Sequence, residues 1–424
     1  MNPIAVKYGD LGRNTVVESS SVVAAVSYVA GRPNGETTVK ILVVTPIPTP
    51  YRDPFWQTLS VQPDIKLTVV YCAPGKTDRP WSASNTEFSY TRLFPRGGNV
   101  FKWLGWGNSC YWNSGVGEIL ENAEPDVVLV GGYNHLTILS AVRRCKRNRI
   151  PWFPMSESWQ QRSGLMGRVK RKILRWWLNS AGGALPTGIR ASKCLSGLGV
   201  SSDRQCFLPN VPDIESLGRF SDELQSQTSQ VKVKLGVEPD QRLVVFAARM
   251  IEKKRPLLVI EAFLRLKNKD DVTLVMIGDG PLMNKAKELA GQCDDSSRIV
   301  FPGFLRPEQV HRWMAVADVF VQPSTETWGV APIEALSCGV PVVLTDQIGC
   351  AADVLPDPSL GIVLQTVDAE SLTDAMNTFL NHSCDHCANK GKWQIWSRQN
   401  TYSVLSSRLS DFLHTSVSHN EAAS

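Results

Sequence analysis

The sequence predicts an α/β protein built from two doubly wound, Rossmann-like domains. Short apolar runs typical of buried strands alternate with helical segments through both halves of the chain, as in parallel sheets with helices on both faces. The 424 residues suffice for two domains with separate cores. The formal charge also changes sign, from +12 over residues 1–205 (25 Lys and Arg against 13 Asp and Glu) to −7 over residues 206–424 (20 against 27).

The N-terminal half is expected to form one domain over residues 39–208, after a loosely ordered extension at residues 1–38. Its predicted strands cover residues 40–45, 66–72, 126–132, 152–155 and 184–187, and helices are expected near Trp56 and over residues 136–145. Three prolines, Pro46, Pro48 and Pro50, make the loop after the first strand rigid.

The C-terminal half is expected to form a second domain over residues 209–390, entered through residues 208–213. Polar residues 221–230 are predicted to form a surface loop. The predicted strands are residues 243–248, 272–277, 299–301, 318–323, 342–345 and 361–364, with helices at 257–267, 282–290, 307–317 and 369–380. Further helices are expected within residues 391–424, before a loose tail.

Two glutamates, Glu326 and Glu334, stand eight positions apart in the string E-T-W-G-V-A-P-I-E-A-L-S-C-G-V-P-V-V. This string joins a strand, a polar loop, a short helix and another strand, and ligands of such units lie at the carboxyl ends of the strands. Gly329 permits close approach of the backbone to a ligand, and the N–H groups before the helix suit an anion or hydroxyls. A charged loop with a glutamate placed for the helix dipole would explain either glutamate alone.

Arg249 and Lys254 are expected in the loop after the strand at residues 243–248. A guanidinium and an ammonium group together can neutralise a diphosphate without a metal ion. A solvated basic loop is the alternative interpretation. The chain contains no Asp-x-Asp sequence, which disfavours a chelated metal ion.

Arg249, Lys254, G-D-G-P at residues 278–281 and the E-x7-E string together resemble the donor site of retaining glycosyltransferases of family four, which have the GT-B fold. The resemblance covers about residues 39–412, with its specific motifs within 249–346. It implies two domains facing across a cleft, with the C-terminal helices packing back on the first domain. It also implies transfer of a hexose from a nucleoside diphosphate sugar, without cofactor or metal, in envelope or exopolysaccharide assembly.

The resemblance also implies roles for individual residues. Arg249 and Lys254 would stabilise the leaving diphosphate, and Glu326 would bind sugar hydroxyls. The implied donor-binding residues are Gly278, Gly329, Val330, Ala331 and Glu334, with Glu334 on the ribose. Lys253 and Arg255 depart from the family pattern and are interpreted as bystanders. A nucleotide-sugar epimerase, a phosphorylase or a non-catalytic sugar-nucleotide-binding protein on the same fold remain alternatives.

The family pattern is weaker in the first half. The residues that could line the acceptor side of the cleft are Tyr133, Asn134, His135 and Glu157. Each follows a predicted strand, although a lone histidine is more often an ordinary hydrogen-bonded residue.

Eleven Lys and Arg residues lie between positions 143 and 175, against one acid, Glu157. In residues 168–177 the cations alternate with apolar side chains at helical spacing, which is typical of a helix on an anionic membrane and equally of a helix that packs one apolar face on its own sheet. No nucleic-acid-binding module accompanies the charge. No apolar run approaches the roughly 18 residues of a membrane span, so we expect a cytoplasmic protein, peripheral on the membrane's inner face.

The ten cysteines are scattered without a disulfide framework, as in a reducing compartment. One close pair, Cys384 and Cys387, has His382 nearby and could suggest zinc. A structural zinc site normally needs a second pair, which the sequence lacks, so this interpretation is disfavoured.

Overall fold

The computed structural model describes the residue ranges 38–75, 87–100, 110–133, 135–160, 164–266, 270–292, 298–355, 357–382 and 384–423, with side chains to residue 417. Residues 38–424 form one compact unit. The expected N-terminal extension therefore lies outside the described residues, apart from its last position.

The first sheet has six strands in the order β3-β2-β1-β6-β7-β8, and all neighbours are parallel. A small antiparallel pair, β4 and β5, lies outside it. The strands are β1 Val39–Thr45, β2 Ile65–Tyr71, β3 Thr91–Leu93, β4 Gly97–Asn99, β5 Tyr111–Asn113, β6 Val127–Gly131, β7 Trp152–Ser156 and β8 Leu185–Pro186.

The second sheet repeats this order as β11-β10-β9-β12-β13-β14, again with parallel neighbours only. Its strands are β9 Arg242–Ala247, β10 Val272–Ile277, β11 Ile299–Gly303, β12 Val319–Gln322, β13 Val342–Thr345 and β14 Gly361–Leu364. The strand order reverses between β1 and β6 in one sheet and between β9 and β12 in the other. Ligands of such sheets bind outside the carboxyl ends of the strands at this reversal.

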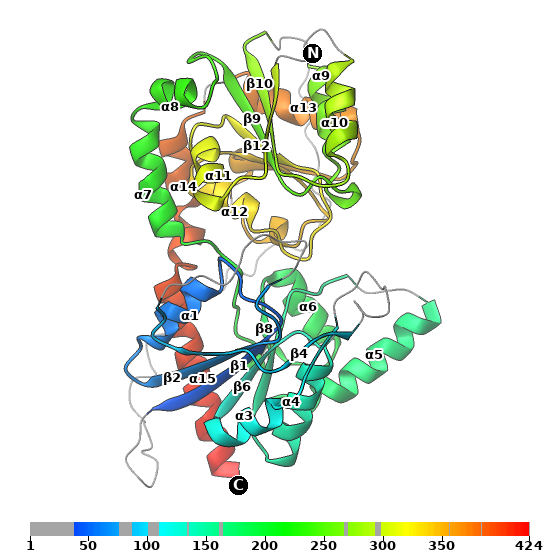
Figure 1. The fold of residues 1–424 in the computed structure, drawn as a ribbon, viewed down its shortest axis with the longest axis vertical. Coiled ribbons are helices and arrows are strands. Elements are labelled where there is room, and N and C mark those ends of the chain that lie inside the picture. Colours follow the sequence, from blue (N-terminus) through cyan, green and yellow to red (C-terminus); the bar gives the residue numbers. More distant parts are fainter. Residues whose placement is uncertain are drawn as a thin grey trace, which may run out of the picture. The chain divides into compact units, whose positions relative to one another are not determined.

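Helices cover both sheets (Figure 1). With the first sheet lie α1 Asp53–Ser60, α3 Val116–Ala123, α4 Leu136–Arg147, α5 Gly164–Leu178 and α6 Ile189–Gly197. With the second lie α7 Ile214–Gln225, α8 Thr228–Lys234, α9 Pro256–Leu264, α10 Met283–Gly291, α11 Pro307–Ala315, α12 Ala331–Ser337 and α13 Ala369–Leu380. The chain ends in α14 His386–Arg398 and α15 Tyr402–Ala423.

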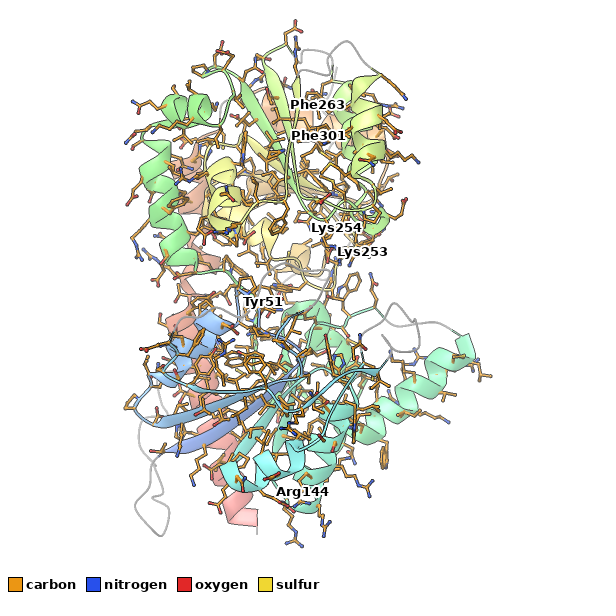
Figure 2. The ribbon with its side chains drawn as sticks, in the orientation of Figure 1. Tyr51, Arg144, Lys253, Lys254, Phe263 and Phe301 are labelled. Carbon is orange, nitrogen blue, oxygen red and sulfur yellow. The ribbon has the colours of Figure 1, made fainter. Side chains whose placement is uncertain are left out.

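Three large groups of buried apolar side chains hold these layers together. One lies between the second sheet and α9, α10 and α13, and it includes Phe263 of α9 with Phe301 of β11 packed against it (Figure 2). Another lies between the first sheet and α3, α4, α5 and α6. The largest contains side chains of both sheets together with α1, α7, α11, α12 and α15, so the two sheets share a continuous core.

Helix α15 packs against α1 of the first sheet. The hydroxyl of Tyr402, at the start of α15, donates to the carbonyls of Tyr51 and Val211 at 3.2 and 3.1 Å. Farther along α15, His414 Nε2 lies 2.6 Å from Asp64 Oδ2. The last helix therefore contacts the first sheet's side of the molecule.

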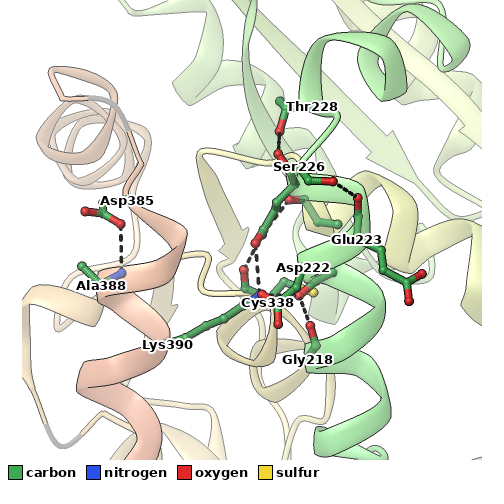
Figure 3. Close-up of polar contacts among 12 residues, drawn as sticks. Gly218, Asp222, Glu223, Ser226, Thr228, Cys338, Asp385, Ala388 and Lys390 are labelled. Carbon is green, nitrogen blue, oxygen red and sulfur yellow. Dashed lines mark hydrogen bonds and ion pairs between the residues drawn. The ribbon is translucent and has the colours of Figure 1, made fainter.

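The predicted loop at residues 221–230 is wrong, because residues 221–225 belong to α7 and residues 228–230 to α8, with a two-residue turn between them. Asp213 caps α7 by accepting from Ser216 N at 3.0 Å. Lys390 of α14 donates to Ser221 Oγ and Asp222 Oδ1, both at 2.6 Å, while Gln225 Nε2 donates to Cys338 O at 2.7 Å (Figure 3). Tertiary contacts thus stabilise a helix whose polar composition alone suggested a loop.

Among the described residues, no helix combines the length and apolar character needed to cross a bilayer.

Candidate active site

The loop after β9 holds its cations in a fixed backbone. It contains a 3₁₀ turn, Glu252–Lys254, and reaches α9 through Arg255, whose φ is +52°. The guanidinium of Arg255 donates to Pro323 O at 2.7 Å and to Gln347 Oε1 at 3.0 Å. These contacts tie the cationic loop to the segments after β12 and β13, while the interpretation of Arg255 as a bystander of the donor stays a prediction.

Lys254 and Glu326 form an ion pair at the carboxyl ends of β9 and β12. Lys254 Nζ contacts Glu326 Oε1, and both side chains are mostly buried, at 16% and 15% exposed. Lys253 Nζ lies 3.7 Å from Glu326 Oε2 and is 57% exposed, so its contact with the carboxylate is longer and more solvated than that of Lys254. Lys253 and Lys254 lie together on this loop in Figure 2. The strand reversal of the second sheet therefore carries two ammonium groups and a carboxylate, and Arg249 lies exposed on the same loop.

Gly278 and Gly280 permit a close approach between the loop after β10 and the loop after β9. Gly278 has φ +131°, and a Cβ there would lie 1.9 Å from Ala248 O. At Gly280, with φ +154°, it would lie 2.7 Å from Met250 O. The Met250 N–H donates to Asp279 O at 2.9 Å, which holds the two loops together on either side of Arg249.

Gly329 also lies where a side chain would be strained. Its φ is +105°, and a Cβ there would lie 3.0 Å from Ile348 Cγ2. Val330 caps α12, which begins at Ala331. The helix therefore starts three residues earlier than the second glutamate, and Glu334 lies in its first turn rather than opening it.

Glu334 lies with His311 rather than with the lysines. Its Oε1 is 3.3 Å from His311 Nε2 of α11. Both side chains line a cavity of about 290 Å³ whose described lining also includes Tyr51, Asp213, Glu308 and Tyr402. Burial, and next the negative charge of Asp213, raise the pKa of the Tyr402 phenol, which therefore stays neutral. The two glutamates of the E-x7-E string thus lie in two different surroundings, one cationic and one acidic.

Glu157 and Trp159, which follow β7 of the first sheet, both contact the E-x7-E loop. The Oε2 atom of Glu157 accepts from Thr327 Oγ1 at 2.9 Å while Oε1 accepts from Asn210 Nδ2. Two residues later, Trp159 Nε1 donates to Thr327 O at 3.0 Å. Glu157 therefore contacts Thr327, the residue that follows Glu326 in the chain.

The other acceptor-side residues lie in different places. Tyr133 packs its ring edge-on against Trp177 of α5, with centroids 6.0 Å apart. His135 caps α4, and its Nδ1 accepts from Tyr111 N at 3.3 Å. Asn134 lies outside the described residues. The structure therefore brings Glu157, but not His135, into contact with the glutamate loop.

Several residues of this site were missed by sequence reasoning. Trp159 and Thr327 join the two halves, and Arg190 stacks on Trp159, with its guanidinium carbon 4.7 Å from the ring centroid. Arg190 also donates to Asp346 O. The hydrogen bonds of Trp159 with Thr327 and of Arg190 with Asp346 link positions more than 150 residues apart, and no local pattern in the sequence indicates them.

Asp353 makes another contact between the halves. Its Oδ1 accepts from Ile189 N of α6 at 2.9 Å. Burial raises the pKa of this carboxyl to about 6, against the smaller lowering by the Ile189 hydrogen bond and Arg190. Asp353 is therefore partly protonated slightly below neutral pH.

The cysteine pair near the C-terminus has other partners. Burial raises the pKa of Cys384 to about 12, so its thiol stays protonated, and it lies 3.6 Å from Gly339 O. His386 Nε2 lies 2.9 Å from Ala317 O. In the described part of the chain, no group of three or more His, Cys, Asp and Glu side chains is placed to hold a metal ion.

Residues 227–393 match the family model described as glycosyl transferases group 1. Among similar curated proteins, the alpha-monoglucosyldiacylglycerol synthase of Streptococcus pneumoniae is 32% identical over 121 residues, 28% of this chain and 27% of its own length. The putative glycosyltransferase EpsF of Bacillus subtilis is 29% identical over 238 residues, covering 55% and 57%. The matches thus span less than two thirds of these relatives.

Among solved structures, HepE of Anabaena in complex with UDP and glucose matches with a TM-score of 0.64, covering 88% of this chain and 99% of HepE at 18% identity. WaaG, a glycosyltransferase involved in lipopolysaccharide biosynthesis, matches with a TM-score of 0.61 at 16% identity, covering 88% and 99%. These likenesses concern the fold. Residues 227–393 therefore resemble the glycosyl transferases group 1 family, and with its two parallel six-stranded sheets the chain has the GT-B fold.

Proposed function

We propose that this protein transfers a hexose from a nucleoside diphosphate sugar to an acceptor hydroxyl, with retention of anomeric configuration and without a metal ion. The observation that carries the proposal is the Lys254–Glu326 ion pair at the strand reversal of the second sheet. Residues 39–208 form the acceptor-side domain, residues 209–390 the donor-side domain, and helices in 391–424 return to the first.

Groups of opposite charge beside the second sheet bind the two parts of the donor, cations the diphosphate and a carboxylate the sugar. The leaving diphosphate gains negative charge as the sugar carbon becomes oxocarbenium-like, and Arg249 and Lys254 stabilise that charge more in the transition state than in the ground state. When the diphosphate takes over the Lys254 ammonium, the Glu326 carboxylate is released to accept from sugar hydroxyls. The ion pair therefore holds both groups in position before the donor arrives.

The cavity beside Glu334 suits the ribose and not the phosphates. Its described lining includes the carboxylates of Asp213, Glu308 and Glu334, which would repel a diphosphate but accept hydrogen bonds from hydroxyls. Glu334 binds the ribose hydroxyls, and its contact with His311 fixes the carboxylate. Gly278, Gly329, Val330 and Ala331 bring backbone groups close to the donor.

The acceptor is an envelope or exopolysaccharide glycan, or a lipid that carries one. The relatives support this proposal: one is named a glucosyldiacylglycerol synthase, and WaaG is described as involved in lipopolysaccharide biosynthesis. The acceptor approaches from the first sheet, where Glu157 contacts Thr327.

Helix α5 places the enzyme on the inner face of an anionic membrane. Five apolar side chains of this helix are 51% to 80% exposed: Leu165, Met166, Val169, Ile173 and Trp176. At about 100° per residue they share one face, flanked by the exposed cations Arg168, Lys172 and Arg175. Each cation near such a surface contributes on the order of 1 kcal/mol, weakened by salt.

Donor screening followed by a turnover assay tests the transferase activity. The melting temperature is measured with UDP-, GDP- and ADP-sugars, and release of nucleoside diphosphate from the stabilising donor is measured with and without membrane lipid extract. Acceptor-dependent release with a retained anomer in the product supports the proposal. Sugar isomerisation without acceptor indicates an epimerase, and tight binding without turnover indicates a non-catalytic protein.

Sedimentation with liposomes tests the membrane surface separately. We expect binding to anionic vesicles at low salt, weaker binding at high salt, and a loss on changing Val169 and Ile173 to serine. Equal binding to anionic and neutral vesicles, or none to either, would show that the exposed face of α5 has another role.

A further inference from the structure

A second cavity, of about 120 Å³, lies on the inner side of α5, and we call it the α5 cavity. Tyr133 lies two residues beyond β6 and Ser158 two residues beyond β7, so the cavity adjoins the carboxyl ends of two neighbouring strands of the first sheet. Gln160, Lys170 and Arg171 also line it. It therefore occupies the edge of the first sheet where parallel sheets bind ligands.

The lining of the α5 cavity is cationic, in contrast to the cavity at Glu334. Lys170 and Arg171 are its charged residues, and no Asp or Glu is among the described residues that line it. Tyr133, Ser158 and Gln160 add hydroxyl and amide donors. A guanidinium and an ammonium beside neutral donors select a phosphate-type anion, which accepts several charge-assisted hydrogen bonds at once.

The α5 cavity lies beside the site proposed for sugar transfer. Glu157 and Trp159 contact Thr327, while Ser158 and Gln160, in the same short segment, line the cavity. Three residues span at most about 10 Å of chain. A ligand anchored in the cavity by its anionic group can therefore present a neighbouring hydroxyl to the Glu326 loop.

The volume of the α5 cavity suits a head group rather than a whole nucleotide sugar, because pockets for drug-sized ligands span about 300 to 1,000 Å³. The same helix carries the exposed apolar face of α5 on its other side. An acceptor whose phosphate enters the cavity would thus have its apolar part beside a surface that suits lipid.

Resting on the transferase function proposed above, we infer that the α5 cavity binds the phosphate or diphosphate group of the acceptor. The anion belongs either to a lipid or to a soluble phosphorylated molecule, and both sources share the chemistry that Lys170 and Arg171 recognise. The cavity would then fix the acceptor class, while the second sheet fixes the donor.

Calorimetric titration with two probes tests this inference. The full-length protein is titrated with inorganic pyrophosphate and with dihexanoyl phosphatidic acid, both in saturating UDP and GDP so that the donor cations are occupied. The cavity variants are Lys170→Gln and Arg171→Gln. The matched controls are Lys66→Gln and Arg398→Gln, which remove the same charge from exposed positions outside α5.

We expect each cavity variant to weaken binding at least about tenfold, which corresponds to the loss of one charge-assisted contact. The controls should change it less than about twofold, and Arg171→Lys should restore part of the affinity. Tighter binding of the lipid probe indicates a lipid-borne acceptor, and equal binding of both probes indicates a soluble one. Either result supports the anion site.

Three results would overturn the inference: no binding of either soluble probe, equal weakening by cavity and control variants, or binding only to intact anionic vesicles. The last would assign these cations to the membrane surface alone. Nucleotide binding is measured in the same proteins. A protein that binds the probes but no nucleotide would count against the transferase function and not against the anion site.

Discussion

The two sheets have the same strand order, yet the cations in the loops after the equivalent strands β9 and β1 have different contacts. After β9, the loop carries Arg249, Lys253 and Lys254, and the lysines face the Glu326 carboxylate. After β1, the corresponding loop is rich in proline and ends at Arg52, whose guanidinium donates to Leu208 O at 2.9 Å. Burial lowers the pKa of Arg52 to about 10, so it stays charged at neutral pH.

This difference separates cations that we propose act on a ligand from a cation whose contacts support the fold. Arg52 contacts the ring faces of Phe55 and Trp56, with centroid distances of 5.7 and 5.9 Å, and holds the segment that enters the second half of the chain. The cations after β9 end at a carboxylate that a ligand can displace. Topologically equivalent positions therefore have different functions, and substitutions should affect different measurements.

The largest effect is expected from Lys254→Ala and Arg249→Ala. Each should lower transfer by at least about 10²-fold, as loss of a group that stabilises transition-state charge usually does. The melting temperature should change little, because the charge of Glu326 can be neutralised by Lys253 or reach water. Release of nucleoside diphosphate in the presence of acceptor measures the effect.

Lys253→Ala is the matched control, since its ammonium is farther from Glu326 and 57% exposed. Wild-type transfer in both Arg249→Ala and Lys254→Ala would remove the proposed catalytic role of this loop.

The close approach of backbones at Gly278 predicts the next largest effect. Gly278→Ala places a Cβ against Ala248 O at a strained φ and should lower the free energy of unfolding by about 3 kcal/mol or more. Gly132→Ala in the first sheet, at φ +88° with nothing within 4 Å of its Cβ, should cost only about 1 kcal/mol. Urea denaturation compares the two. Similar losses would mean that backbone strain, and not the contact between loops, decides the cost.

Arg52→Ala tests the structural role of the first loop. The substitution leaves Leu208 O without its donor and removes contact with two rings, so we expect a loss of about 2 kcal/mol in unfolding free energy. Nucleotide affinity, measured by calorimetry on the folded variant, should stay within about threefold of wild type. A large loss of affinity with unchanged stability would reverse the assignment.

Much of the fold could be predicted because buried parallel strands are continuous apolar runs, as in residues 272–277 and 342–345. The donor-side residues were proposed from the sequence because their motifs are local, within one loop or one turn of helix. The contact between Glu157 and Thr327 was not, since it joins positions 170 residues apart. The helix at α7 was missed because its polar face is satisfied by Lys390, a partner contributed from α14.

The raised pKa of Asp353, which accepts a hydrogen bond from Ile189 N of α6, predicts that the stability of the fold depends on pH. The folded pKa of Asp353, about 6, exceeds the unfolded value, so the folded state binds the proton more tightly. Its contribution to stability is fully present below about pH 4 and is lost as pH rises to about 6. Asp353→Asn does not titrate, and its stability relative to wild type should improve by about 2 kcal/mol over this range. Urea denaturation at several pH values measures this, and a constant difference would contradict it.

The smallest expected effect is that of a chelator on transfer. Under the proposed function, Arg249 and Lys254 neutralise the diphosphate in place of a metal ion, and the sequence contains no Asp-x-Asp to hold one. Transfer in EDTA should therefore equal transfer in magnesium within assay error. The comparison sharpens if Lys254→Ala is assayed beside the wild type, because partial rescue of the variant alone by magnesium would show that ammonium and metal do the same electrostatic work. Loss of wild-type transfer in EDTA, restored by magnesium or manganese, would mean that the cationic loop does not suffice.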